Sequence, residues 1–154
     1  MKLGFKKVHP DAKIPTYAHP GDAGMDVYAV EDVLLPVGKP KLVNTGLVAE
    51  IPTGYELQVR PRSGLALKGV TVFNSPGTVD CSFRGSIGVI LLAVVGTQLS
   101  RNFVTGEVTY EFAIRKGDRI AQLVLAPVTR CEPVEISEVS ATERGEGGFG
   151  STGR

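Results

Sequence analysis

The sequence contains little cysteine, no tryptophan and no excess of charge of either sign. Of its 154 residues, only Cys81 and Cys131 are cysteines. Two distant cysteines cannot supply a cysteine-rich zinc site, and so low a content is typical of a reducing compartment inside the cell. The 17 Lys and Arg residues nearly balance the 16 Asp and Glu residues, which gives a formal net charge of +1. This balance argues against the overall basicity that recruits nucleic acid.

Long apolar segments are missing as well. The longest apolar run, IGVILLAVVG (87–96), is too short to cross a bilayer and is typical of a buried strand. The first residues, MKLGFKKVHP, contain basic side chains without the apolar stretch of a secretory signal. We therefore expect a cytoplasmic protein that has neither a membrane nor a nucleic acid as its partner.

Glycine and proline are abundant, with 19 and 10 residues, and they separate short stretches of alternating polarity. The segments YELQVR (55–60) and VTYEFAIR (108–115) alternate in the way of half-buried strands. Further strand candidates are 26–30, 41–51, 70–74, 86–95, 119–127 and 134–139. Only SGLALK (63–68) looks helical, with Ser63 as a candidate N-cap. The pattern predicts one all-β domain, a sandwich or jelly-roll barrel with one short helix.

Five glycine-containing segments carry groups that suit a nucleotide. They are GDAGMD (21–26), PRSGLA (61–66), NSPGTVD with FRG (74–85), KGDRIAQL (116–123) and RGEGGFGSTG (144–153). Arginine binds phosphate oxygens through two N–H groups, glycine lets backbone N–H groups approach phosphates, and an aromatic ring can stack on a base. Taken alone, each segment is explained as well or better by an ordinary feature, namely a turn, a helix start, a hairpin, a solvated strand side chain or a disordered tail.

In this order, the five segments resemble the five motifs of the trimeric deoxyuridine triphosphatases (dUTPases), from about residue 14 to residue 153. The resemblance implies a β jelly-roll homotrimer with active sites between subunits. It implies Mg²⁺-assisted hydrolysis of dUTP to dUMP and pyrophosphate, which keeps uracil out of DNA and supplies dUMP for thymidylate synthesis. It also implies that residues 1–142 form the β-domain and that residues 143–154 form a flexible lid over another subunit's site.

The resemblance further implies roles for individual residues. Asp80 would be the general base that activates the attacking water, and Asp26 would hold Mg²⁺ indirectly through water, with the ion bound mainly by the triphosphate. Phe83 would pack under the deoxyribose, although most members of the family have Tyr at this position. The other substrate-binding residues would be Arg62, Ser63, Gly64, Gln122 and Arg144 for the phosphates, Asn74, Gly77, Thr78 and Val79 for uracil, and Phe149, Gly150 and Ser151 in the lid.

Two other functions remain open. The dCTP deaminases share this fold and often have Phe at the position of Phe83, but their catalytic carboxylate corresponds to Ile90, which cannot transfer protons. The second is a non-catalytic regulatory protein on the same fold, although Asp80 and the tail are both present. The segment 96–107 is longer than the family's usual turn, and it predicts either a longer hairpin tip or an arm that binds a protein partner.

Overall fold

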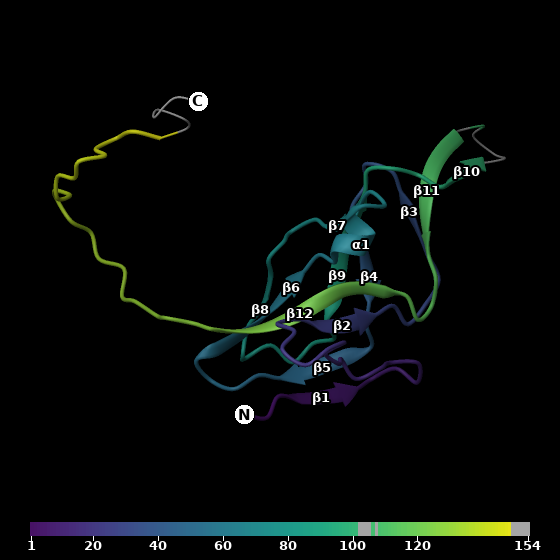
Figure 1. The fold of residues 1–154 in the computed structure, drawn as a ribbon, viewed down its shortest axis with the longest axis horizontal. Coiled ribbons are helices and arrows are strands. Elements are labelled where there is room, and N and C mark those ends of the chain that lie inside the picture. Colours follow the sequence, from purple (N-terminus) through teal and green to yellow (C-terminus); the bar gives the residue numbers. More distant parts are fainter. Residues whose placement is uncertain (102–105, 107, 149–154) are drawn as a thin grey trace.

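The fold of the chain, in a computed structural model, is built almost entirely of short strands (Figure 1). The structure describes residues 1–101, 106 and 108–148. Within them it contains one helix, α1 (Ser63–Ala66). The strands are β1 (Gly4–Lys7), β2 (Met25–Tyr28), β3 (Val33–Pro36), β4 (Lys41–Asn44), β5 (Leu47–Glu50), β6 (Tyr55–Arg60), β7 (Val70–Val72), β8 (Gly77–Val79), β9 (Gly88–Ala93), β10 (Gln98–Arg101), β11 (Val108–Ile114) and β12 (Arg119–Pro127).

The strands pair in antiparallel fashion into small sheets. The largest described sheet has the order β2-β12-β6-β8, and two further sheets have the orders β4-β9-β7 and β10-β11-β3. Strands β1 and β5 form a two-stranded ribbon. Neighbours in a sheet are therefore distant in sequence, and this brings the predicted motifs on β2, β6 and β12 to one sheet.

Alternation of side chains places one face of each strand in the core. Leu57 and Val59 of β6 are buried, whereas Glu56 and Gln58, which alternate with them, are partly exposed. The same period of two buries every second residue of β9. The described elements confirm the all-β prediction with one short helix. The sequence allowed this prediction because apolar residues at a period of two all fall on one side of a strand, where they can be buried. No described helix has the length and apolar character that a membrane span requires.

Two details of the prediction are wrong, one in a strand and one at the start of the helix. The expected strand 41–51 is divided into β4 and β5, because Gly46 lies in a turn with a φ of +65°. A Cβ at Gly46 would lie only 2.5 Å from the Cβ of His9, so this turn also needs the close approach that glycine allows. Ser63 is not the N-cap of α1, since Arg62 occupies that position without a capping side-chain hydrogen bond.

The expected strand 134–139 is not a strand in the described chain. This stretch runs away from the sheets without a neighbouring strand (Figure 1). Its apolar side chains are exposed, with Val134 at 71%, Ile136 at 61% and Val139 at 83%. An extended segment becomes a strand only when another backbone satisfies its N–H and C=O groups, and a single chain offers none here.

Strand β10, which lies within the segment 96–107, projects together with the start of β11 from one end of the sheets (Figure 1). Strand β10 pairs with β11, so that Leu99 lies opposite Tyr110. Both side chains are exposed, by 60% and 61%. Residues 102–105 and 107 lie outside the described part of the chain, and the role of this segment stays a prediction.

Candidate functional site

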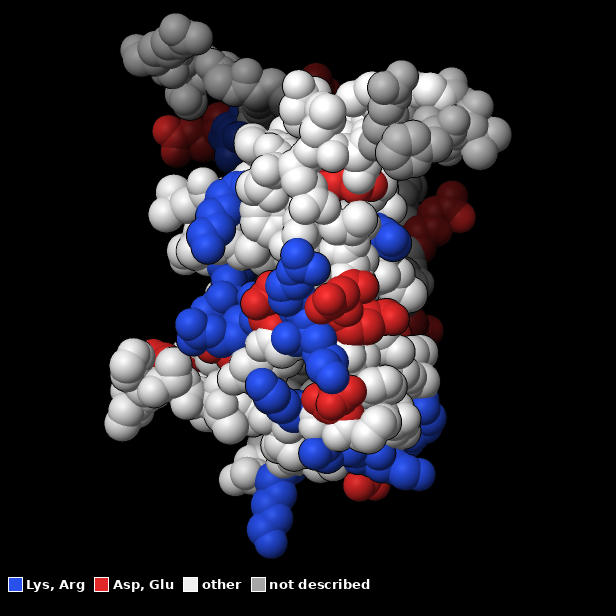
Figure 2. All heavy atoms as spheres, turned by 90° about the vertical axis from the view of Figure 1, so that its right-hand side faces the viewer, with Lys and Arg blue, Asp and Glu red and all other residues white. Residues whose placement is uncertain are grey.

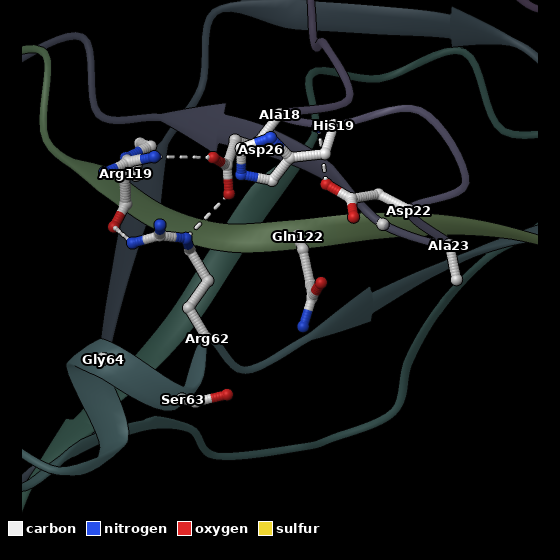
Figure 3. A pocket seen from close by; sticks show the side chains of 11 residues that line it. Ala18, His19, Asp22, Ala23, Asp26, Arg62, Ser63, Gly64, Arg119 and Gln122 are labelled. Atoms are coloured by element: carbon white, nitrogen blue, oxygen red, sulfur yellow. Dashed lines mark hydrogen bonds and ion pairs between the residues drawn. The ribbon is translucent and has the colours of Figure 1, made fainter.

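A polar pocket, here called the phosphate pocket, brings together three of the five predicted segments (Figure 3). It lies where β2, β12 and the start of α1 meet, and its volume is about 420 Å³. Its lining residues are Ala18, His19, Asp22, Ala23, Gly24, Asp26, Arg62, Ser63, Gly64, Arg119 and Gln122. The predicted residues of the first, second and fourth motifs therefore share one site.

Asp26 holds two arginines in this pocket. Its Oδ1 accepts a hydrogen bond from Arg62 Nε at 2.7 Å, and its Oδ2 accepts one from Arg119 Nη1 at 3.1 Å. Arg62 Nη1 also donates to the Arg119 carbonyl at 3.3 Å. The Asp26 side chain is only 13% exposed. Because a largely buried carboxylate fixes both guanidinium groups, the pocket offers an anion two oriented cations.

A bulge in β12 puts Arg119 on the pocket side of the sheet. Residues three apart in a regular strand face opposite sides, so Arg119 and Gln122 would point away from each other. The register between β12 and β2 shifts between Arg119 and Ala121, and both Ile120 and Ala121 are buried. The extra residue is thus absorbed on the core side, and Arg119 and Gln122 both join Asp26 in the pocket.

Gln122 connects two of the motifs. Its Nε2 donates to the carbonyl of Pro61 at 2.8 Å, which ties β12 to the residue that precedes Arg62. Its carboxamide lies directly against Gly24, where an added Cβ would overlap the Gln122 Oε1 and stand 2.9 Å from Cδ. A side chain at position 24 would therefore displace the Gln122 carboxamide from the position in which it contacts Pro61.

Ser63 and Gly64 form the exposed edge of the phosphate pocket at the start of α1 (Figure 3). The first N–H groups of a helix have no partner inside that helix, so they can bind a ligand. A Cβ at Gly64 would meet nothing within 4 Å. Packing within this chain therefore gives no reason for glycine here, whereas a ligand that approaches the backbone would.

The third motif lies elsewhere, in a turn after β8 that we call the Asp80 turn (residues 80–85). Asp80 is exposed, and its carbonyl accepts a hydrogen bond from the N–H of Phe83 at 3.0 Å. Asp80 and Phe83 border a second pocket of about 160 Å³. The other residues that line it are Thr78, Val79, Ser86, Ile87 and Gly88. The structure thus brings the predicted base and the predicted sugar-contacting ring together.

The loop before β8 carries Asn74, which was predicted for the uracil pocket. Asn74 is exposed, and its carboxamide lies against Gly77, where a Cβ would stand 3.2 Å from Nδ2 and 3.4 Å from Oδ1. Gly77 is buried and pairs with Val59 of β6. A side chain at position 77 would therefore push Asn74 out of place.

Within one chain, the Asp80 turn lies far from the phosphate pocket. Val79 pairs with Leu57 near the start of β6, whereas Arg62 follows the end of the same strand. Asp80 and Glu56 line a common surface, which places Asp80 at the level of Glu56. The six residues from Glu56 to Arg62 span about 20 Å at 3.3 Å per residue. The structure therefore does not bring Asp80 to Arg62 and Arg119 of its own chain.

The described part of the tail, residues 143–148, lies away from the sheets of its own chain (Figure 1). Arg144 is exposed, and its Nε donates to the carbonyl of Gly147 at 2.7 Å within a local turn. Phe149, Gly150 and Ser151 lie outside the described part of the chain, and their predicted roles are not addressed by the structure.

Sequence reasoning did not single out three polar residues of the phosphate pocket. Arg119 lies inside the fourth segment, and its charge could have marked it as a phosphate-binding residue. The sequence does not reveal the bulge that turns its side chain into the pocket. Asp22 and His19 belong to the turn before β2, where the N–H of His19 donates to Asp22 Oδ2 at 2.9 Å. Figure 2 shows that basic and acidic side chains lie next to one another over the face it presents.

The carboxylates of the described chain do not gather into a metal site. Within residues 1–101, 106 and 108–148, no cluster of three or more His, Cys, Asp or Glu side chains could hold a metal. Both carboxylate oxygens of Asp26 are already bonded to arginines. The described residues therefore do not form a metal site by themselves, and an ion bound here would need to bring most of its ligands with it.

Comparisons with known proteins agree with this geometry. A family model described as dUTPase matches residues 10–153. The deoxyuridine 5'-triphosphate nucleotidohydrolase of a Picosynechococcus species is 50% identical over 154 residues, and that of a Hydrogenobaculum species is 51% identical over 156 residues. Each match covers 99% of both chains. The Staphylococcus bacteriophage 80alpha dUTPase with dUPNHPP has a TM-score of 0.84 and 30% identity, over 99% of each chain.

These matches extend over all five predicted segments and over the whole architecture. The likeness to the phage structure confirms the predicted dUTPase type of all-β fold. Half of the residues are identical to those of curated relatives of nearly the same length. The chain therefore belongs to the dUTPase family.

Proposed function

We propose that this protein hydrolyses dUTP to dUMP and pyrophosphate. The observation that carries the proposal is the phosphate pocket, where Asp26 orients Arg62 and Arg119 beside the exposed start of α1. Two fixed guanidinium groups suit a triphosphate, because they neutralise its charge and fix its direction. The relatives in Picosynechococcus and Hydrogenobaculum, which carry the dUTP-hydrolysing name, support the choice of this nucleotide.

Each residue of the pocket would make a different contact with the phosphates. Arg62 would bind phosphate oxygens, Ser63 and Gly64 would offer a hydroxyl and backbone N–H groups, and Gln122 would keep this loop in place through Pro61. Arg119 would neutralise part of the negative charge of the terminal phosphates. Because these groups are held before the ligand arrives, little ordering is required on binding.

Magnesium would be the cofactor, held mainly by the triphosphate, with Asp26 in contact through water. When bound, the ion would withdraw charge from the phosphate oxygens and stabilise the leaving pyrophosphate. Asp26 would keep the arginines oriented at the same time, since its two oxygens already accept their hydrogen bonds.

Asp80 would accept the proton of the attacking water. The water oxygen would form a bond to the α-phosphorus in line with the leaving group, and the bond from this phosphorus to the bridging oxygen would break. The exposed carboxylate on the Asp80 turn is accessible to such a water. Asn74, Gly77, Thr78 and Val79 would surround uracil, and Phe83 would pack under the deoxyribose.

The distance between Asp80 and Arg62 supports an active site shared between subunits. A general base must reach its water within hydrogen-bonding distance, and about 20 Å along β6 separates the two groups in one chain. The exposed Val134 and Ile136 on the extended segment support the same conclusion, because they need a neighbouring chain to become buried. A homotrimer with three equal sites would meet both requirements.

The tail would act as a lid on such a site. Residues 143–154 would close over the nucleotide, with Arg144 on the terminal phosphates, Phe149 stacked on uracil, and Gly150 and Ser151 beside them. The segment 96–107 would be either a longer hairpin tip or an arm for a protein partner. Cytoplasmic location remains part of this proposal.

One assay tests the reaction against the closest alternative. The purified protein is supplied with dUTP and dCTP separately, and both pyrophosphate and ammonia are measured. We expect pyrophosphate from dUTP and little product from dCTP, dTTP or UTP. Ammonia from dCTP at a comparable rate would favour a deaminase. No product from any nucleotide would favour a regulatory protein.

A further inference from the structure

The ring of Phe83 rests on a glycine within the Asp80 turn. A Cβ at Gly85 would stand 2.5 Å from Cζ of Phe83, 3.0 Å from Cε2 and 3.2 Å from Cε1. Such distances are well below van der Waals contact, so the far end of the ring occupies the space that a side chain at position 85 would fill. The backbone of Gly85 has no positive φ, and its conformation therefore gives no separate reason for glycine.

The turn around this ring is fixed by its own hydrogen bonds. Arg84 Nη1 donates to the carbonyls of Cys81 and Phe83, at 2.8 Å and 2.9 Å. The Phe83 N–H donates to the Asp80 carbonyl. With its backbone held at both ends, Phe83 can change the position of its ring only by rotating its side chain. Because Phe83 is 46% exposed, the ring has room to rotate outward.

We propose that Gly85 is a specificity-determining position that holds Phe83 against the sugar. Gly85 would act through Phe83, because the absence of a side chain at this position leaves room for the end of the ring and so sets how closely the ring approaches the sugar's C2′. A ring in this position leaves no room for a 2′-hydroxyl, so dUTP is accepted and UTP is rejected. This inference rests on the proposed function, since it needs the Asp80 turn to be part of a dUTP site.

The experiment compares hydrolysis of dUTP and UTP by four forms of the full-length protein. They are the unchanged chain, Gly85→Ala, Phe83→Ala and the double variant. The measured quantity is the ratio of kcat/KM for dUTP to kcat/KM for UTP. In Gly85→Ala the added methyl group pushes the ring outward, and we expect the ratio to fall about tenfold or more, within the range for misfit in a pocket.

The double variant separates a role through the ring from a role in the backbone. If Gly85 acts through Phe83, adding Gly85→Ala to Phe83→Ala changes the ratio no further, because the ring is already gone. A general loss of folded protein lowers both rates in proportion and leaves the ratio unchanged. An unchanged ratio in Gly85→Ala, or an equal fall in both backgrounds, would overturn the inference.

Folding of the variants gives a further distinction. If Gly85→Ala fails to fold while the double variant folds, contact with the ring is the cause and the inference is supported. If both fail while Phe83→Ala folds, the glycine serves the backbone and the inference is wrong. Failure of the unchanged chain to hydrolyse dUTP would refute the proposed function itself, and it is recognised before any variant is compared.

Discussion

The phosphate pocket and the Asp80 turn are held in place in opposite ways. In the pocket, Asp26, Arg62 and Arg119 come from three distant parts of the sequence and bind one another. In the turn, Asp80 and Phe83 are fixed by hydrogen bonds within six residues. A change in the pocket should therefore spread through the network, whereas a change in the turn should stay local.

The largest effect is expected at the turn, where the chemistry itself depends on one group. Asp80→Asn removes the proton acceptor and keeps the size of the side chain. We expect kcat for dUTP to fall by about 10²–10⁴, with binding of dUTP preserved. Steady-state kinetics and a binding measurement check this. Glu56→Gln, at the neighbouring carboxylate, is the matched control and should change kcat only a few-fold. Near-normal turnover in Asp80→Asn would place the base elsewhere.

The next largest loss of kcat is expected when the tail is removed. Removal of the residues after Thr142 should lower kcat by a smaller factor than Asp80→Asn, since lid closure excludes water but does not supply the base. Light scattering should show an unchanged assembly, because none of the described residues among those removed, 143–148, belongs to the core. Phe149→Trp, the only tryptophan in such a chain, should retain activity and report closure through its fluorescence. Full activity of the shortened chain would contradict the lid.

Within the pocket, Asp26→Ala tests whether the network orients the arginines. Loss of the carboxylate leaves two guanidinium groups without their shared partner, and a displacement of about 1 Å can cost about 10²-fold in rate. We expect kcat/KM for dUTP to fall by about that factor while the fold is retained. Asp11→Ala is the control, because Asp11 also pairs with a cation but is 44% exposed. Equal effects of both changes would show that the orientation of the arginines is unimportant.

A smaller effect on the KM for dUTP is expected at Gly24, which lies directly against the side chain of Gln122. Gly24→Ala should displace the Gln122 carboxamide and break its hydrogen bond to Pro61. Loss of one such bond corresponds to about tenfold in affinity, and we expect the KM for dUTP to rise by about that factor. In a Gln122→Ala background, Gly24→Ala should have no further effect. A full additional effect there would mean that Gly24 acts through something other than Gln122.

Sequence alone predicted much of the fold because burial dictates the alternation of polarity. The strand 119–127 was predicted with the bounds that β12 has, since its apolar residues and flanking turn are unambiguous. The strand 41–51 was predicted as one element because Gly46 alone does not reveal its positive φ. The segment 134–139 has the polarity of a strand, but a strand also needs a neighbour, which one sequence does not specify.

The candidate site was predicted to a different depth in its two regions. Asp80 and Phe83 are close in sequence, so their proximity followed from a tight turn. Arg62, Gln122 and Asp26 were found through the motifs, but their mutual contacts depend on which strands pair. Arg119 was missed because a bulge decides which face it occupies, and a bulge has no reliable signal in a single sequence. Long-range pairing therefore limits such predictions more than residue chemistry does.

The smallest effect is expected for an ion pair outside both regions, and it tests whether burial gives the Asp26 network its importance. Lys116 Nζ lies 3.3 Å from Asp11 Oδ2, and the two side chains are 56% and 44% exposed. Water solvates both groups and salt screens them, so such a pair contributes about 0–1 kcal/mol. Lys116→Gln should therefore shift the melting temperature by no more than about 4 °C and leave kcat/KM for dUTP unchanged. The Arg62–Asp26 pair has a similar composition but exposures of only 23% and 13%. A loss of stability for Lys116→Gln as large as that for Asp26→Ala would show that charge pairing, and not its burial, sets the difference.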